Sequence, residues 1–134
     1  MLLVDTNVLV DVLEDDPDWA DWSVRQLRMQ SQVHDLAINP VIYAELSLAF
    51  DSVAALDDTL DGMQIAIAEI PRPALFLAGR AFVKYRRSGG TKSNVLSDFF
   101  IGAHAAVLGC GILTRDVRRY AQYFKTVPLI APEA

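Results

Sequence analysis

Five short apolar runs, separated by longer helical patterns, constrain the fold of this chain most strongly. The first run, Leu2-Leu3-Val4, is too short for a buried helix and is typical of a strand covered on both faces. Strands that alternate with helices in this way form a parallel sheet. The sequence therefore predicts an α/β fold with helices on both faces of the sheet. The expected strands are 2–4, 36–38, 64–68, 112–114 and 127–130.

The helices between these runs have recognisable start and stop signals. Asn39-Pro40 and Asp16-Pro17 each place a capping side chain before a proline that suits the first turn. Ser97 is expected to cap a helix over 98–108, and Gly109 is expected to end it in the left-handed conformation. The expected helices are 8–13, 17–31, 40–48, 52–60, 71–87 and 98–108.

Length and composition limit the class of protein. With 134 residues, a hydrophobic share of 52% and a mean hydropathy of +0.24, the chain is expected to form a single domain over 1–134. Its one cysteine allows no internal disulfide, and its N-terminus shows no signal peptide. The longest uncharged stretch, 99–114, contains three glycines and is shorter than the roughly 20 residues that cross a bilayer. We expect a soluble cytoplasmic protein without membrane contact.

Charge is distributed unevenly along the chain. The net charge is −5, yet residues 1–79 carry −11 and residues 80–125 carry +7. Such a division allows one side of the molecule to bind an anionic ligand. We expect Arg86, Arg87 and Lys92, beside a glycine-containing loop, and Arg115 to contact this anionic ligand. Solvated helix faces are the ordinary alternative.

Four acidic residues lie where predicted strands end or the next helix begins. Asp5 follows the first strand, Asp116 follows the fourth, and Asp98 opens a helix. Glu45 lies in the second turn of the helix after the second strand. Each acid alone has an ordinary explanation. Asp98 and Asp116 could complement helix dipoles, Asp5 could cap the first helix, and Glu45 could be a solvated helix residue. Because ligands of open parallel sheets bind beyond the carboxyl ends of the strands, the four together predict one acidic pocket.

Crowded carboxylates of this kind favour a divalent cation. Like charges raise one another's pKa and cost stability unless a cation compensates them. Mg²⁺ and Mn²⁺ prefer carboxylate oxygens, and no histidine or cysteine is well placed as a further ligand. His104, for example, lies about 240° around the expected helix from Asp98, so the two do not share a face. A cation there would suit cleavage of a phosphodiester bond by water.

The four acids lie in four sequence blocks: Leu3-Val4-Asp5-Thr6-Asn7-Val8-Leu9, Asn39-Pro40-Val41-Ile42-Tyr43-Ala44-Glu45-Leu46, Leu96-Ser97-Asp98-Phe99-Phe100-Ile101-Gly102-Ala103-His104-Ala105 and Leu113-Thr114-Arg115-Asp116. These blocks resemble the PIN-domain ribonucleases, in particular the VapC-like toxins of type II toxin–antitoxin systems. They follow the family's order and span almost the whole chain. Ser97 departs from a proline that often precedes the third acid.

The resemblance implies a fold, a site and partners. It implies a three-layer α/β/α sandwich around a parallel sheet, RNA as the substrate, a homodimer, and a cognate antitoxin protein that covers the site. By position, the metal-binding and catalytic acids would be Asp5, Glu45, Asp98 and Asp116, and the supporting polar residues would be Thr6, Asn7 and Thr114. With RNA as the substrate, the expected RNA-binding residues are Arg86, Arg87, Lys92 and Arg115, because cations around an acidic cleft neutralise backbone phosphates.

Two other functions stay open at the level of sequence. A phosphatase could use the acid after the first strand as its nucleophile, but it would normally need a second acid two residues later, where this chain has Asn7. A PIN-like module that binds RNA or protein without catalysis is the other alternative. The presence of all four acids favours a metal-dependent endoribonuclease that uses Mg²⁺ or Mn²⁺.

Overall fold

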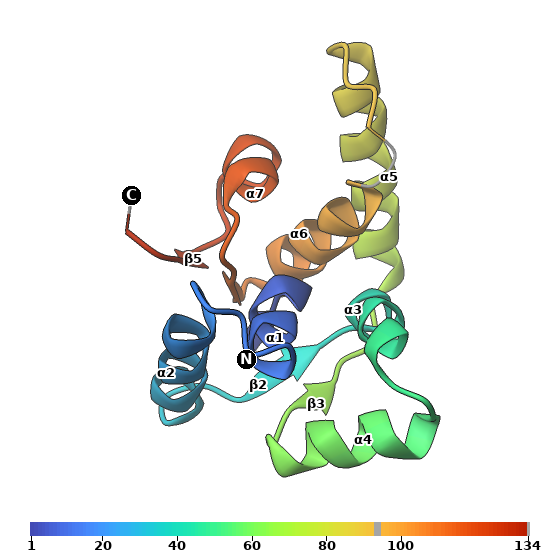
Figure 1. Cartoon of the computed structure of the whole chain (residues 1–134). Helices are drawn as coiled ribbons and strands as arrows, with labels where there is room; N and C mark the ends of the chain where they lie inside the picture. Colours follow the sequence, from blue (N-terminus) through green and yellow to red (C-terminus); the bar gives the residue numbers. More distant parts are fainter. Residues whose placement is uncertain (93–94, 134) are drawn as a thin grey trace.

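A computed structural model describes residues 1–92 and 95–133 and contains a five-stranded parallel sheet (Figure 1). The strand order is β3-β2-β1-β4-β5, and every neighbouring pair is parallel. The strands are β1 (Leu2–Val4), β2 (Leu36–Ile38), β3 (Ala66–Ile67), β4 (Gly111–Leu113) and β5 (Leu129–Ile130). All residues of β1 and β2 are buried, as expected for strands between two helical layers.

Helices flank this sheet and complete the predicted three-layer α/β/α fold. In the described residues they are α1 (Thr6–Leu13), α2 (Ala20–Ser31), α3 (Pro40–Leu46), α4 (Val53–Gly62), α5 (Arg72–Arg87), α6 (Leu96–Leu108) and α7 (Arg118–Tyr123), with a 3₁₀ turn over Ser47–Ala49. The long helix α5 packs along α6, and Figure 1 shows its C-terminal part extending well beyond the sheet. None of the described helices is long and apolar enough to cross a bilayer.

The strand order places the central strand at a topological switch point. From β1 the chain moves outward through β2 to β3, and then returns to the other side of β1 with β4 and β5. Leu3 of β1 is in register with Ala37 of β2 and with Ile112 of β4. The connections on the two sides of β1 therefore diverge at its carboxyl end, and this divergence creates a crevice in which α/β folds bind ligands.

Three predicted helix starts differ from the structure. The helix α1 begins at Thr6 rather than at residue 8, because the Asp5 side chain caps it by accepting from the Thr6 N–H. The helix α6 begins at Leu96 rather than at Asp98, and Val95, not Ser97, occupies the cap position without a side-chain hydrogen bond. Val95 is 7% exposed, so its packing in the core outweighs the capping preference of serine. The helix α2 begins at Ala20 instead of residue 17, because the Asp16 carboxylate accepts hydrogen bonds from the N–H groups of Asp18 and Trp19 and forms a separate turn.

Three further elements were predicted incompletely. The run 127–130 forms a strand only at Leu129–Ile130. The run 64–68 forms a strand only at Ala66–Ile67, and both residues are exposed because β3 is an edge strand. The short helix α7 was not predicted. The signals at Asn39 and Gly109 are confirmed: Asn39 Oδ1 accepts from the Ile42 N–H at 3.0 Å, and Gly109 has a φ of 67°.

Candidate acidic site at the carboxyl edge of the sheet

Asp5 lies at the centre of the candidate site, where β1 ends and α1 begins. It is 5% exposed and caps α1, with Oδ1 accepting from the Thr6 N–H at 2.8 Å. Its other oxygen, Oδ2, accepts from the hydroxyls of Thr114 and Tyr120, each at 2.8 Å. Burial raises the pKa of Asp5 above its ordinary value, and these hydrogen bonds act in the opposite direction because they stabilise the ionised form.

Glu45 is brought to the same edge by α3. The Asn39-Pro40 start orients this helix so that its second turn faces the beginning of α1. The Thr6 hydroxyl donates to Glu45 Oε1 at 2.6 Å, while the Thr6 N–H binds Asp5. Thr6 therefore contacts two of the four predicted acids at once.

Asp98 lies within electrostatic range of the other three acids. It lies in the first turn of α6 and is partly buried. The pKa of Asp98 rises from 3.8 to about 7, chiefly because burial disfavours its charge and further because Asp5, Glu45 and Asp116 repel it. A buried contact between Asn39 Nδ2 and His104 Nδ1, at 3.3 Å, joins the start of α3 to α6 and so links the helices that carry Glu45 and Asp98.

Asp116 is the least converged of the four acids. Its carboxylate forms a bidentate ion pair with Arg118, with Nη2 at 2.8 Å from Oδ2 and Nε at 3.1 Å from Oδ1, and it is exposed. The hydrogen bond from Arg118 lowers the pKa of Asp116. Within residues 1–92 and 95–133, no three acidic, histidine or cysteine side chains stand close enough together to hold an ion without rearrangement.

The supporting polar residues connect the acids to the backbone. Thr114 is fully buried, and its hydroxyl also accepts from the Asp116 N–H at 3.1 Å. Asn7 donates from Nδ2 to that hydroxyl at 3.4 Å, and its Oδ1 accepts from the Arg115 N–H at 3.1 Å. Asn7 on α1 therefore holds the segment that follows β4.

The predicted RNA-contacting cations fall into two groups. Arg86, Arg87 and Lys92 are exposed at and beyond the C-terminal end of α5. Arg115 is different, because its Nε and Nη2 bind the two carboxylate oxygens of Asp11 at 2.7 and 2.8 Å. Asp11 is 2% exposed. The guanidinium of Arg115 therefore connects the segment between β4 and α7 to α1.

Two site features were missed by sequence reasoning. Tyr120 contacts Asp5 directly, yet it lies on a helix of six residues that no clear periodicity marks. Asp11 is one of the acids of residues 1–79, and its position four residues after Asn7 places both side chains on the same face of α1. This spacing of four residues was the one sequence feature that could have indicated that Asp11 acts beside Asn7.

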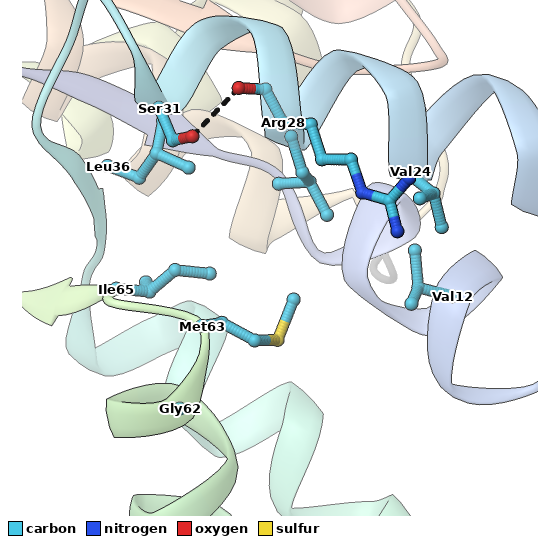
Figure 2. A pocket seen from close by; sticks show the side chains of 9 residues that line it. Val12, Val24, Arg28, Ser31, Leu36, Gly62, Met63 and Ile65 are labelled. Atoms are coloured by element: carbon cyan, nitrogen blue, oxygen red, sulfur yellow. Dashed lines mark hydrogen bonds between the residues drawn. The ribbon is translucent and has the colours of Figure 1, made fainter.

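A separate apolar pocket lies between α1, α2 and the end of α4, and Figure 2 shows the side chains that converge on it. Its volume is about 400 Å³, and none of the predicted site residues lines it. The lining residues are Val12, Val24, Leu27, Arg28, Ser31, Leu36, Gly62, Met63 and Ile65.

Known structures share this fold over nearly their whole length. The chain matches VapBC2 from Rickettsia felis bound to a DNA fragment from their promoter (TM-score 0.74, 18% identity, 98% of each chain covered). It also matches FitAcB from Neisseria gonorrhoeae (TM-score 0.64, 19% identity, 97% of this chain and 96% of that chain). A third match is a toxin–antitoxin complex from Klebsiella pneumoniae (TM-score 0.60, 20% identity, 90% and 91%).

Sequence comparison identifies the family. A search of curated proteins found no match. The sequence model of the PIN domain, in contrast, matches residues 2–125 and thus includes all four acids and every strand except β5. By this match the chain belongs to the PIN domain family.

Proposed function

We propose that this chain is a metal-dependent endoribonuclease, with the single domain 1–134 acting as the toxin of a toxin–antitoxin pair. The observation that carries the proposal is the acidic crowding at the carboxyl end of the central strand: Thr6 contacts both Asp5 and Glu45, and the pKa of Asp98 is raised to about 7, first by burial and then by repulsion from these acids. Such repulsion is costly in a protein unless a cation relieves it. The PIN domain assignment supports the same conclusion.

The donor set fits Mg²⁺ or Mn²⁺. Carboxylate oxygens are the preferred ligands of these hard cations, and no thiolate or imidazole joins the three converging acids in the described part of the chain. When bound, the cation supplies Lewis acidity toward a phosphoryl oxygen and a water of lowered pKa. The proposed metal-binding and catalytic residues are Asp5, Glu45, Asp98 and Asp116.

The protein's own groups prepare this site. Thr6 holds Glu45, which serves as a ligand or orients the attacking water. Thr114 and Asn7 fix the orientation of Asp5 and of the backbone beside Asp116. For Asp116 to join the ligands, its carboxylate must exchange Arg118 for the cation, and the exposed position of this ion pair makes the exchange inexpensive.

RNA would approach over the exposed basic end of α5. Arg86, Arg87 and Lys92 are proposed to neutralise backbone phosphates. Arg115 was expected to do the same, but two of its N–H groups are bound to Asp11, so we assign it to holding the site together.

The proposed partners follow from the family resemblance and the structural matches. One match is described as a toxin–antitoxin complex, which supports a cognate antitoxin as the partner of this chain. A homodimer in the cytoplasm is proposed as well. A module that binds RNA without cutting it is the second candidate, because Asp116 is engaged by Arg118 and not by the other acids.

Cleavage of structured RNA tests the proposal directly. The protein is incubated with RNA in Mg²⁺, in Mn²⁺ and in chelator, beside Asp98→Asn and the matched control Asp58→Asn, which alters an exposed acid of α4. We expect cuts that need the metal, persist in the control and disappear in Asp98→Asn. Binding without cutting would support the second candidate, and turnover of a small phosphomonoester would indicate a phosphatase.

The salt dependence of RNA binding tests the basic surface. The double variant Arg86→Ala/Arg87→Ala is compared with Arg25→Ala/Arg28→Ala, which removes two exposed arginines of α2. Each lost phosphate contact should reduce the slope of log K against log salt by about 0.7 for single-stranded RNA. If the slope of log K against log salt is equal in the two double variants, Arg86 and Arg87 do not contact the RNA backbone.

A further inference from the structure

The hydroxyl of Tyr120 is a buried polar group with a specific partner. Tyr120 is 1% exposed, and its hydroxyl donates to Asp5 Oδ2 at 2.8 Å across 115 positions of the sequence. A buried tyrosine hydroxyl costs free energy unless it finds a hydrogen-bond partner. Phenylalanine would fill the same space without that cost, so the hydroxyl has a role that packing alone does not require.

Asp5 is held by three donors from three segments of the chain. Oδ2 accepts from Tyr120 on α7 and from Thr114 after β4, and Oδ1 accepts from the Thr6 N–H at the start of α1. Because the two oxygens have different partners, rotation of the carboxylate breaks all three contacts. Two carboxylate oxygens offer about four lone-pair positions, so one position remains for another ligand.

Aromatic packing fixes α7 against the helix that carries Asp98. The ring of Phe99 on α6 lies 5.2 Å from that of Tyr123 and 6.2 Å from that of Phe124, measured between centroids. Tyr123 belongs to α7, and Phe124 follows it directly. The position of the Tyr120 hydroxyl is therefore set relative to α6 as well as to Asp5.

We propose that Tyr120 is a positioning residue that holds the Asp5 carboxylate in one orientation for a divalent cation. This inference rests on the proposed metal-dependent function. Residues that hydrogen-bond a metal ligand typically contribute 10- to 100-fold to metal affinity or activity, because they remove the need to order the ligand on binding.

The test measures Mn²⁺ binding without RNA. Free Mn²⁺ is followed by electron paramagnetic resonance during titration of the protein, Tyr120→Phe and Tyr123→Phe. Tyr123 is the matched control, since it lies on the same helix but packs against Phe99 and Tyr85. We expect Tyr120→Phe to weaken Mn²⁺ binding about 10-fold or more, and Tyr123→Phe to leave it within about twofold, the precision expected of the titration. The melting temperature in chelator, measured for each variant, separates loss of folding from loss of affinity.

The Thr114 hydroxyl, which also donates to Asp5 Oδ2, gives a second test that does not depend on how well Tyr120→Phe folds. Thr114→Val removes this donor, whereas Thr114→Ser retains it. We expect weaker Mn²⁺ binding in the valine variant alone. If Tyr120→Phe binds Mn²⁺ like the unaltered protein while Asp98→Asn does not, the role of Tyr120 is refuted and the proposed function stands. If the unaltered protein itself binds no Mn²⁺, both fail.

Discussion

Replacing Asp98 by asparagine should stabilise the metal-free protein. Asp98 has a pKa of about 7 in the folded chain against its ordinary 3.8, mainly because of burial and then because of the neighbouring acids. Ionisation of this side chain therefore opposes folding at neutral and alkaline pH. Asparagine has nearly the same shape and no charge, so the variant does not incur this penalty.

The size of the effect follows from the pKa difference. One pKa unit corresponds to about 1.4 kcal/mol, so a charged Asp98 costs at most about 4 kcal/mol of unfolding free energy. Asp98 is only partly buried and water screens its charge, so we take about half of this value, ~2 kcal/mol. For a chain of this size such a change raises the melting temperature by about 5–10 °C.

The pH dependence has a definite sign. Below pH 3.8 the side chain is protonated in both states and carries no penalty. Between 3.8 and about 7 the unfolded chain loses the proton that the folded chain keeps, so the stability of the unaltered protein falls as the pH rises. The advantage of Asp98→Asn should therefore be small near pH 4 and complete above pH 7.

Urea unfolding in chelator, at pH 5 and at pH 8.5, provides the assay. We expect a larger gain for Asp98→Asn at the higher pH, and added Mg²⁺ should reverse the order because only the unaltered site binds it well. Asp116→Asn is the control, since the pKa of Asp116 is lowered by Arg118 and its charge favours folding. An equal gain at both pH values, or the same gain in Asp116→Asn, would refute the raised pKa of Asp98 as the cause.

Four further substitutions test the packing and the ion pairs around the site. Gly102→Ala on α6 should cost about 1–3 kcal/mol in urea unfolding, because its new carbon would lie 2.2 Å from the Phe124 ring. Gly79→Ala on α5 meets no atom within 4 Å and should stabilise by about 0.5–1 kcal/mol. Arg115→Ala, which removes the ion-pair partner of the buried Asp11 carboxylate, should cost about 3 kcal/mol in urea unfolding, whereas Arg118→Ala, at an exposed ion pair, should cost clearly less.

Local sequence signals were sufficient for the sheet and for the placement of most helices. The first two strands, 2–4 and 36–38, agree with the structure residue for residue because each apolar run ends at a polar group. The Asn39 cap was predictable for the same reason, since its partner is only three residues away. Local strand ends and helix starts also predicted that each of the four acids lies beside the carboxyl edge of the sheet.

Contacts between residues far apart in the chain could not be predicted from a single sequence. Val95 begins α6 because it packs in the core, and no local pattern distinguishes it from Ser97 as a cap. Tyr120 is similar, because the contact that explains its hydroxyl lies on the first strand-to-helix turn. Both cases depend on tertiary contacts that outweigh local preference.

Arg115 shows most clearly how contacts that the sequence does not predict affect the interpretation of function. Its position beside Asp116 suggests that Arg115 contacts a phosphate. In the structure, however, Asn7 accepts from the backbone N–H of Arg115 and Asp11 accepts from its guanidinium, and both partners lie on one face of α1. The same face of α1 therefore fixes the segment that carries the Thr114 hydroxyl, which in turn holds Asp5. A cation adjacent to an acidic site can thus serve the site by holding its walls together, and only the position of its partner carboxylate distinguishes that role from substrate binding.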